Sequence, residues 1–172
     1  GTYLGGSEYD AVTDMALGDG GRAIVVGETA SSDFPTTAGA LDRSWGGGMC
    51  AAMRGGPCID GFLTILKPGG GAFDYSTHLG GKDYDIATGV VTDARGNVYV
   101  TGTTSSPDYP VVSGSFDTAL EEGVCTLDEE RTKAPCTDVF VTSFNTARSL
   151  AYSTFIGGGA GVAPRMFVQD YP

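Results

Sequence analysis

The chain is poor in the residues that enzymes and metal sites use most. It has one histidine, His78, and only 18% charged residues in a length of 172. It contains no Gly-x-Ser-x-Gly nucleophile turn, no phosphate-binding P-loop and no Gly-x-Gly-x-x-Gly dinucleotide motif. No combination of residues amounts to a catalytic set. We therefore expect a protein that is not an enzyme.

Basic residues and long apolar runs are also scarce. Ten Lys and Arg stand against 21 Asp and Glu, which gives a net charge of −11. Phosphate backbones and anionic lipid surfaces repel such a chain, so we expect neither nucleic acid nor a membrane as a partner. No apolar run approaches the ~20 residues that span a bilayer. The first six residues lack the basic start and apolar core of a signal peptide. We expect such a peptide to have been removed or never to have been part of this sequence.

Glycine, by contrast, is abundant. The 28 glycines are about one residue in six, yet they show no Gly-X-Y period, which excludes collagen. With 41% hydrophobic and 10% aromatic residues the chain can bury a core, which excludes bulk disorder. The composition is rich in Val, Thr, Tyr and Phe, and this is typical of β-structure with many turns.

The four cysteines form two close pairs. Neither pair is a Cys-x-x-Cys, and His78 lies far from both in sequence, so zinc and haem attachment are disfavoured. We predict two local disulfides, Cys50–Cys58 and Cys125–Cys136, each closing a loop of about ten residues and contributing about 2.5–3 kcal/mol. Disulfides predict an oxidising compartment, and hence an extracellular, cell-surface or periplasmic protein.

The chain repeats itself. The motif at residues 2–6 recurs at residues 77–81 and 154–158, at spacings of 75 and 77 residues. Other features recur at the first spacing: Tyr9-Asp10 with Tyr84-Asp85, Ser31–Pro35 with Ser106–Pro110, and Cys50 with Cys125.

Each full copy predicts four strands. In the first copy they are Val12–Leu17, Ala23–Thr29, Gly61–Leu66 and Ala72–His78; in the second, Ile86–Thr92, Val98–Thr103, Val139–Phe144 and Leu150–Phe155. Strands such as Val139–Phe144 carry apolar residues in both alternating sets, so both faces of each sheet should be buried. Repeated four-stranded antiparallel sheets stacked face to face are typical of a β-propeller. We therefore expect an all-β chain of two propeller-type blades with long, disulfide-closed loop insertions.

Four motifs carry a family resemblance, namely Tyr75–Gly81, Asp93–Gly102, Ser105–Pro110 and Asp138–Val141. Together they resemble the bacterial β-propeller repeat family (SBBP repeats). The resemblance implies an exported bacterial surface protein and supplies no catalytic residue. The cysteine-bracketed insertions are a departure from the usual, shorter repeat of this family.

The repeat spacing predicts four segments. Residues 1–6 would be the end strand of a preceding repeat, 7–81 and 82–158 the two blades, and 159–172 the start of a third repeat. The expected partial strands are Thr2–Leu4 and Met166–Asp170. A closed propeller needs at least about four blades. Either the sequence is a segment of a longer repeat protein, or several chains assemble to cover the open blade faces.

Two groups of residues are candidate binding sites. Carboxylates recur in pairs and are weak Ca²⁺ candidates, with solvated turn residues as the alternative: Glu8, Asp10, Asp83 and Asp85. Loop aromatics could bind sugars or a protein partner, with anchoring of the loops as the alternative: Trp45, Phe34 and Tyr109. His78 replaces an aromatic residue of the other copies, so we expect it to be a packed strand residue. We expect no cofactor other than Ca²⁺ at those carboxylates.

The leading hypothesis is a secreted or cell-surface structural module. It would present its disulfide-closed loops to other protein chains or to further repeats of the same protein. The alternative is a carbohydrate-binding or polysaccharide-active propeller that uses loop aromatics with Asp33, Asp108 or Asp138. A third hypothesis is an accessory subunit of a larger exported assembly.

Overall fold

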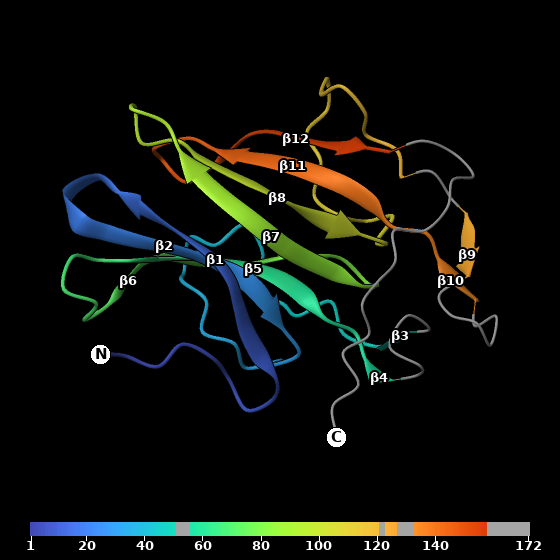
Figure 1. Cartoon of the computed structure of the whole chain (residues 1–172), viewed down its shortest axis with the longest axis horizontal. Helices are drawn as coiled ribbons and strands as arrows, with labels where there is room; N and C mark the ends of the chain where they lie inside the picture. Colours follow the sequence, from blue (N-terminus) through green and yellow to red (C-terminus); the bar gives the residue numbers. More distant parts are fainter. Residues whose placement is uncertain (51–55, 121–122, 127–132, 158–172) are drawn as a thin grey trace.

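The computed structural model describes residues 1–50, 56–120, 123–126 and 133–157 (Figure 1). This part of the chain is all-β, apart from one 3₁₀ turn, η1 (Asp19–Gly21). Its main elements are two four-stranded antiparallel sheets, which we call the N-terminal and the C-terminal sheet. Two short hairpins complete the described structure.

Each sheet follows one copy of the repeat. The N-terminal sheet has the order β1-β2-β5-β6, with strands β1 (Asp10–Gly18), β2 (Arg22–Thr29), β5 (Asp60–Leu66) and β6 (Phe73–Leu79). The C-terminal sheet has the same arrangement, with strands β7 (Asp85–Thr92), β8 (Val98–Thr104), β11 (Asp138–Phe144) and β12 (Leu150–Ile156). All eight predicted strands are confirmed, with bounds within two residues of those observed.

The first strands of the two sheets share an irregularity. Both β1 and β7 shift register, between Val12 and Asp14 and between Ala87 and Gly89. Such a bulge turns a strand locally and frees backbone groups for other contacts. Here the Val90 N–H donates to Asp14 Oδ2 (2.8 Å), and the Thr13 hydroxyl donates to the Ala87 carbonyl. The bulges therefore join the two sheets by hydrogen bonds.

The main core lies between the two sheets, which stack along β1 and β7 (Figure 1). Ile24, Val26, Leu63 and Ile65 of the N-terminal sheet belong to the same buried cluster as Val100 and its neighbours in the C-terminal sheet. Each such side chain contributes about 1.5–3 kcal/mol when it is fully buried. The predicted face-to-face stacking is therefore present for this pair of sheets.

The outer edge strands are covered by the long loops. In the N-terminal sheet the Thr37 N–H donates to the Ser76 carbonyl (3.0 Å), and the His78 N–H donates to Asp42 O (3.1 Å). In the C-terminal sheet the Phe155 N–H donates to Asp117 O in the same way (3.0 Å). An uncovered edge would offer its free N–H and C=O groups to other chains. The loops therefore protect β6 and β12.

The short hairpins were not predicted. Strands β3 (Met49–Cys50) and β4 (Gly56–Pro57) form one, and β9 (Val124–Thr126) and β10 (Lys133–Pro135) form the other. Residues 1–9 form no strand, so the expected strand Thr2–Leu4 is absent here, and the assignment of residues 1–6 to a preceding repeat stays a prediction. The other expected end strand, Met166–Asp170, lies outside the described residues.

Candidate functional site

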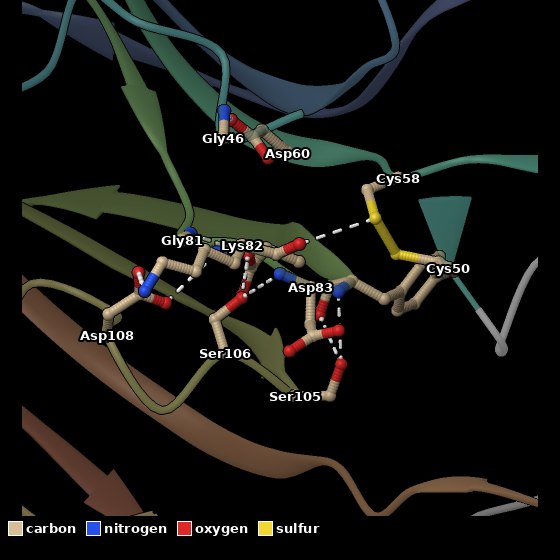
Figure 2. The surroundings of a disulfide bond; sticks show 12 residues. Gly46, Cys50, Cys58, Asp60, Gly81, Lys82, Asp83, Ser105, Ser106 and Asp108 are labelled. Atoms are coloured by element: carbon tan, nitrogen blue, oxygen red, sulfur yellow. Dashed lines mark hydrogen bonds and ion pairs between the residues drawn. A yellow bond between two sulfur atoms is a disulfide. The ribbon is translucent and has the colours of Figure 1, made fainter. Parts of the chain in front are cut away.

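The candidate site is the junction at which the chain passes from β6 to β7. Residues 80–84 make this linker, and side chains of the loop after β8 hold its backbone (Figure 2). The Lys82 N–H donates to Asp108 Oδ1 (3.0 Å), and the Asp83 N–H donates to Ser106 Oγ (2.9 Å). The Gly81 N–H donates to Asp85 Oδ2 (2.8 Å). The linker is thus fixed by hydrogen bonds at successive residues.

The same network occurs at the start of the chain. The Gly6 N–H donates to Asp10 Oδ2 (2.7 Å), the Ser7 N–H to Asp33 Oδ1 (2.8 Å) and the Glu8 N–H to Ser31 Oγ (2.9 Å). The recurrence of Asp10 and Asp33 in the repeat is therefore explained by a structural task. Their carboxylates accept hydrogen bonds from the turn that enters a sheet.

This network bears on the predicted Ca²⁺ residues. Asp10 and Asp85 each accept a hydrogen bond from a backbone N–H and another from a serine hydroxyl. Glu8 and Asp83 take part through their backbone N–H groups. Within the described residues, no group of three or more His, Cys, Asp and Glu is placed to hold a metal ion. Ca²⁺ binding at these four residues stays a prediction.

Two buried carboxyl groups flank the first glycine of the linker. A Cβ on Gly80 would lie 2.9 Å from Cγ of Asp60 and 2.9 Å from Oδ2 of Asp85. Both aspartates are almost fully buried, and in each of them Oδ1 has no hydrogen-bond partner within the described structure. Asp60 comes from the start of β5 and Asp85 from the start of β7. The packing of the two sheets therefore brings these two acids together.

Burial controls the protonation of this pair. It raises the pKa of Asp60 to about 8. The hydrogen bond from the Gly46 N–H lowers this pKa, and the negative charges of Asp85, Asp42 and Asp108 raise it further. Burial also raises the pKa of Asp85 to about 7, although hydrogen bonds from its neighbours oppose the rise. At neutral pH the Asp60 carboxyl is therefore protonated.

His78 lies beside Asp60. Its Nδ1 is 3.7 Å from Asp60 Oδ2, and its ring centroid is 5.7 Å from that of Phe34. Burial lowers the pKa of His78 below its ordinary 6.5, so the ring is neutral at neutral pH. The two groups are neighbours and do not form an ion pair at neutral pH. The prediction that His78 is a packed strand residue agrees with this position.

The first disulfide packs against the linker. Cys50 and Cys58 are bonded and buried, and they form a cluster with Ile59 and Tyr84. Cys58 Sγ lies 3.4 Å from the Lys82 carbonyl oxygen (Figure 2). Gly46, in the same loop, lies so close to Gly81 O that an added Cβ would be only 1.6 Å from it. The hairpin thus braces the linker, while its Met49 side chain stays exposed.

The second hairpin repeats this design. Cys125 and Cys136 are bonded, so both predicted disulfides are present. The Cys136 N–H donates to Gly123 O (3.0 Å), as the Cys58 N–H does to Gly48 O (3.1 Å). In the second copy, the residues equivalent to the linker follow β12. Beyond Gly157 they lie outside the described residues.

Two of the three loop aromatics anchor their loops, which is one of the two roles expected for them. Phe34 and Tyr109 are only 4% and 2% exposed, so they offer no open binding surface. Their rings stack on Phe62 and Phe140, with centroids 4.6 and 4.5 Å apart. They anchor the long loops to the sheets, because burying an aromatic ring removes a large apolar area from water. Trp45 is partly buried, with its Nε1 shielded from solvent.

The carboxylates of the carbohydrate hypothesis also serve the fold. Asp33 and Asp108 hold the two turns described above. Asp138 is largely buried and lies against Gly157, as Asp60 lies against Gly80. Sequence reasoning missed Asp60 itself. The recurrence of an aspartate at this place in both copies, in Asp60-Gly61-Phe62 and Asp138-Val139-Phe140, could have indicated that Asp60 has a role.

Comparison with known families agrees with this architecture. Residues 74–110 match the sequence model of a β-propeller repeat family, SBBP, which confirms the resemblance for the stretch from β6 to the loop after β8. No curated protein matches the chain. The disulfides indicate an oxidising environment. None of the described residues forms a helix long and apolar enough to cross a membrane.

Proposed function

We propose that the chain is a non-catalytic structural and interaction module of two β-propeller-type blades, exported from the cell, whose outer faces bind further blades of the same type. The observation that supports this most directly is a comparison of equivalent positions. The same repeat position is buried in one sheet and exposed in the other, depending on whether a neighbouring sheet is present.

The outer face of the N-terminal sheet illustrates the difference. Val12 is 58% exposed, whereas its equivalent Ala87 is fully buried against the N-terminal sheet. Met15 is 57% exposed, and its equivalent Val90 is 5% exposed. We define Val12, Met15 and Leu17, all apolar and exposed on β1, as the N-face. Apolar positions of this kind are typical of interaction surfaces.

The opposite face of the C-terminal sheet behaves in the same way. Ala16 packs on the core between the sheets, but its equivalent Val91 is 62% exposed. The Thr13 hydroxyl of the N-terminal sheet donates to Ala87 O of the C-terminal sheet. Its equivalent, the Thr88 hydroxyl, donates to Thr101 O of its own sheet (3.4 Å). This second face has the residues that a following blade would contact.

The hairpins and loops offer a second kind of surface. Met49 and Val124 stand exposed next to the two disulfides, and Phe116 is exposed on the loop that covers β12. The disulfides fix the positions of Met49 and Val124, because each disulfide closes a short loop beside a rigid sheet. Such fixed apolar side chains suit contact with another protein chain. The carbohydrate alternative is weaker, because two of its three aromatic residues are buried.

Sedimentation measurements test the proposal. We expect the weight-average mass of the chain to rise with protein concentration above the 17.6 kDa of one molecule. Met15→Lys should abolish this rise, because it places a charge on the N-face. Met49→Lys, also exposed but on the hairpin and outside the faces proposed to bind further blades, is the matched control and should leave the mass unchanged. A mass that stays at one chain at all concentrations, or that falls equally in both variants, would refute binding through the N-face.

A further inference from the structure

Three turns line a basic pocket at one end of the two stacked sheets. They are the β1–β2, β7–β8 and β11–β12 turns, and the pocket has a volume of about 220 Å³. Three arginines line it: Arg22, Arg95 and Arg148. They are three of only ten basic residues in a chain of net charge −11. This concentration of positive charge is unusual for so acidic a protein.

Each of these arginines occurs in only one of the two copies of the repeat. At the equivalent positions the other copy has Asn97 for Arg22 and Gly20 for Arg95. The Arg148 N–H donates to Asn145 O (2.9 Å), as the Gly70 N–H does to Lys67 O (2.9 Å) in the first sheet. The fold itself therefore does not require an arginine at any of these positions.

The backbone of Arg148 adds to this argument. Its φ of 65° lies in the left-handed region, and Gly70, at the equivalent place, has a φ of 70°. Among the described residues Arg148 is the sole non-glycine residue with a positive φ. A side chain at such a position is disfavoured, and retained strain of this kind is often associated with a functional site.

The guanidinium groups still have hydrogen-bonding capacity. Arg22 Nε donates to Asp74 Oδ2 (3.1 Å), and Arg148 Nη2 lies 3.6 Å from the same oxygen. Arg148 Nη1 is buried and has no partner in the described structure. Arg95 is exposed and makes no ion pair with any described residue. The lining contains three arginines and one carboxylate, Asp19, and Asp74 beside it adds a second negative charge.

We propose that this pocket binds a compact oxyanion, that is, a carboxylate, phosphate or sulfate group. A guanidinium presents paired N–H donors whose spacing matches two oxygens of such a group. Arg95 and Arg148 supply the guanidinium groups, and Thr146 lies in the same lining. The volume is below the roughly 300–1,000 Å³ of pockets for larger organic ligands. A single charged group therefore fits better than an extended molecule.

Titration with inorganic phosphate, sulfate and acetate, at an ionic strength held constant with NaCl, tests this site. We expect at least one anion to shift the amide NMR signals of Gly96, Thr146 and Arg148 in a saturable way. Binding of acetate but not phosphate would identify a carboxylate site, and the converse a phosphate site. Absence of saturable shifts with all three anions would overturn the proposal.

Two variants locate the effect. Arg95→Gln should weaken the binding at least tenfold without loss of folding, because Arg95 is exposed and forms no ion pair with the part of the chain that the structure describes. Arg43→Gln, also an exposed arginine but outside the pocket, is the matched control and should bind as the unchanged chain does. Arg148→Gly relieves the positive φ and should remain folded while losing the binding. Equal binding by Arg95→Gln and Arg43→Gln would show that the pocket is not the site.

Discussion

The Asp60→Asn variant tests the buried proton at the junction. The folded pKa of Asp60, about 8, lies above the ordinary value of 3.8, so the folded chain holds a proton that the unfolded chain has lost between these pH values. The free energy of unfolding should therefore fall as pH rises, by about 1.4 kcal/mol per pH unit from this one group. Between pH 5 and pH 7 the loss amounts to about 2.7 kcal/mol.

The variant should lose this dependence. An asparagine resembles the protonated acid, can still accept the hydrogen bond from the Gly46 N–H, and carries no titrating proton. In urea unfolding at pH 5, 6 and 7, the stability of the variant should gain on that of the unchanged chain by about 1.4 kcal/mol per pH unit, and so by about 2–3 kcal/mol in total from pH 5 to pH 7. Asp85 and His78 titrate in both proteins, so their contributions largely cancel in the difference.

The control is Asp33→Asn. Hydrogen bonds from Ser7 lower the pKa of Asp33 below its ordinary 3.8, so this group is ionised in both states throughout the range from pH 5 to 7. Its replacement should change stability by the same amount at each pH. Parallel curves for the unchanged chain and Asp60→Asn would mean that Asp60 is ionised in the folded protein, and the reasoning about the junction would then be wrong.

Three other predictions concern the hairpin and the loops. Replacing Cys50 and Cys58 together by serine should lower the free energy of unfolding by about 2–3 kcal/mol and speed amide hydrogen exchange in residues 80–84; unchanged exchange would contradict the bracing role. Gly46→Ala should cost at least about 2 kcal/mol in urea unfolding, because its Cβ meets the Gly81 carbonyl. Gly39→Ala, with open space around it, should cost far less, and equal costs would refute the close approach. Tyr109→Phe should lower the free energy of unfolding by about 1 kcal/mol, because it removes the hydrogen bond to Thr142. An unchanged unfolding midpoint would contradict a stabilising role for this bond.

The strands and the disulfides could be predicted because both are local features. The apolar patterns of segments such as Val139–Phe144 record burial on both faces of a sheet. The cysteine pairs are only 8 and 11 residues apart, so few other pairings compete. The duplication of the strands and the cysteine pairs made these predictions stronger than a single copy would allow.

The burial of Phe34 and Tyr109 could not be seen in the same way. Each ring stacks on a phenylalanine about 30 residues later in the chain, Phe62 or Phe140. Sequence pattern shows an aromatic residue in a loop, but it does not show onto which strand the loop folds back. That choice depends on the loop running along β6 or β12, which only the structure displays.

The junction and the basic pocket depend on contacts between the sheets. Asp60 and Asp85 approach Gly80 because the N-terminal sheet packs on β7. Arg22, Arg95 and Arg148 meet because three turns lie at one end of that stack. Neither arrangement follows from spacing along the chain. The two aspartates come from different sheets, and each arginine occurs in only one copy of the repeat.

The central claim is that a further blade covers the N-face in the native assembly. Oxidative labelling of methionines measures this directly, because Met15 and Met49 are 57% and 72% exposed in the single chain. In the native particle the account predicts that Met15 is protected while Met49 is oxidised at the rate of a free surface residue. Equal oxidation of both methionines would contradict it.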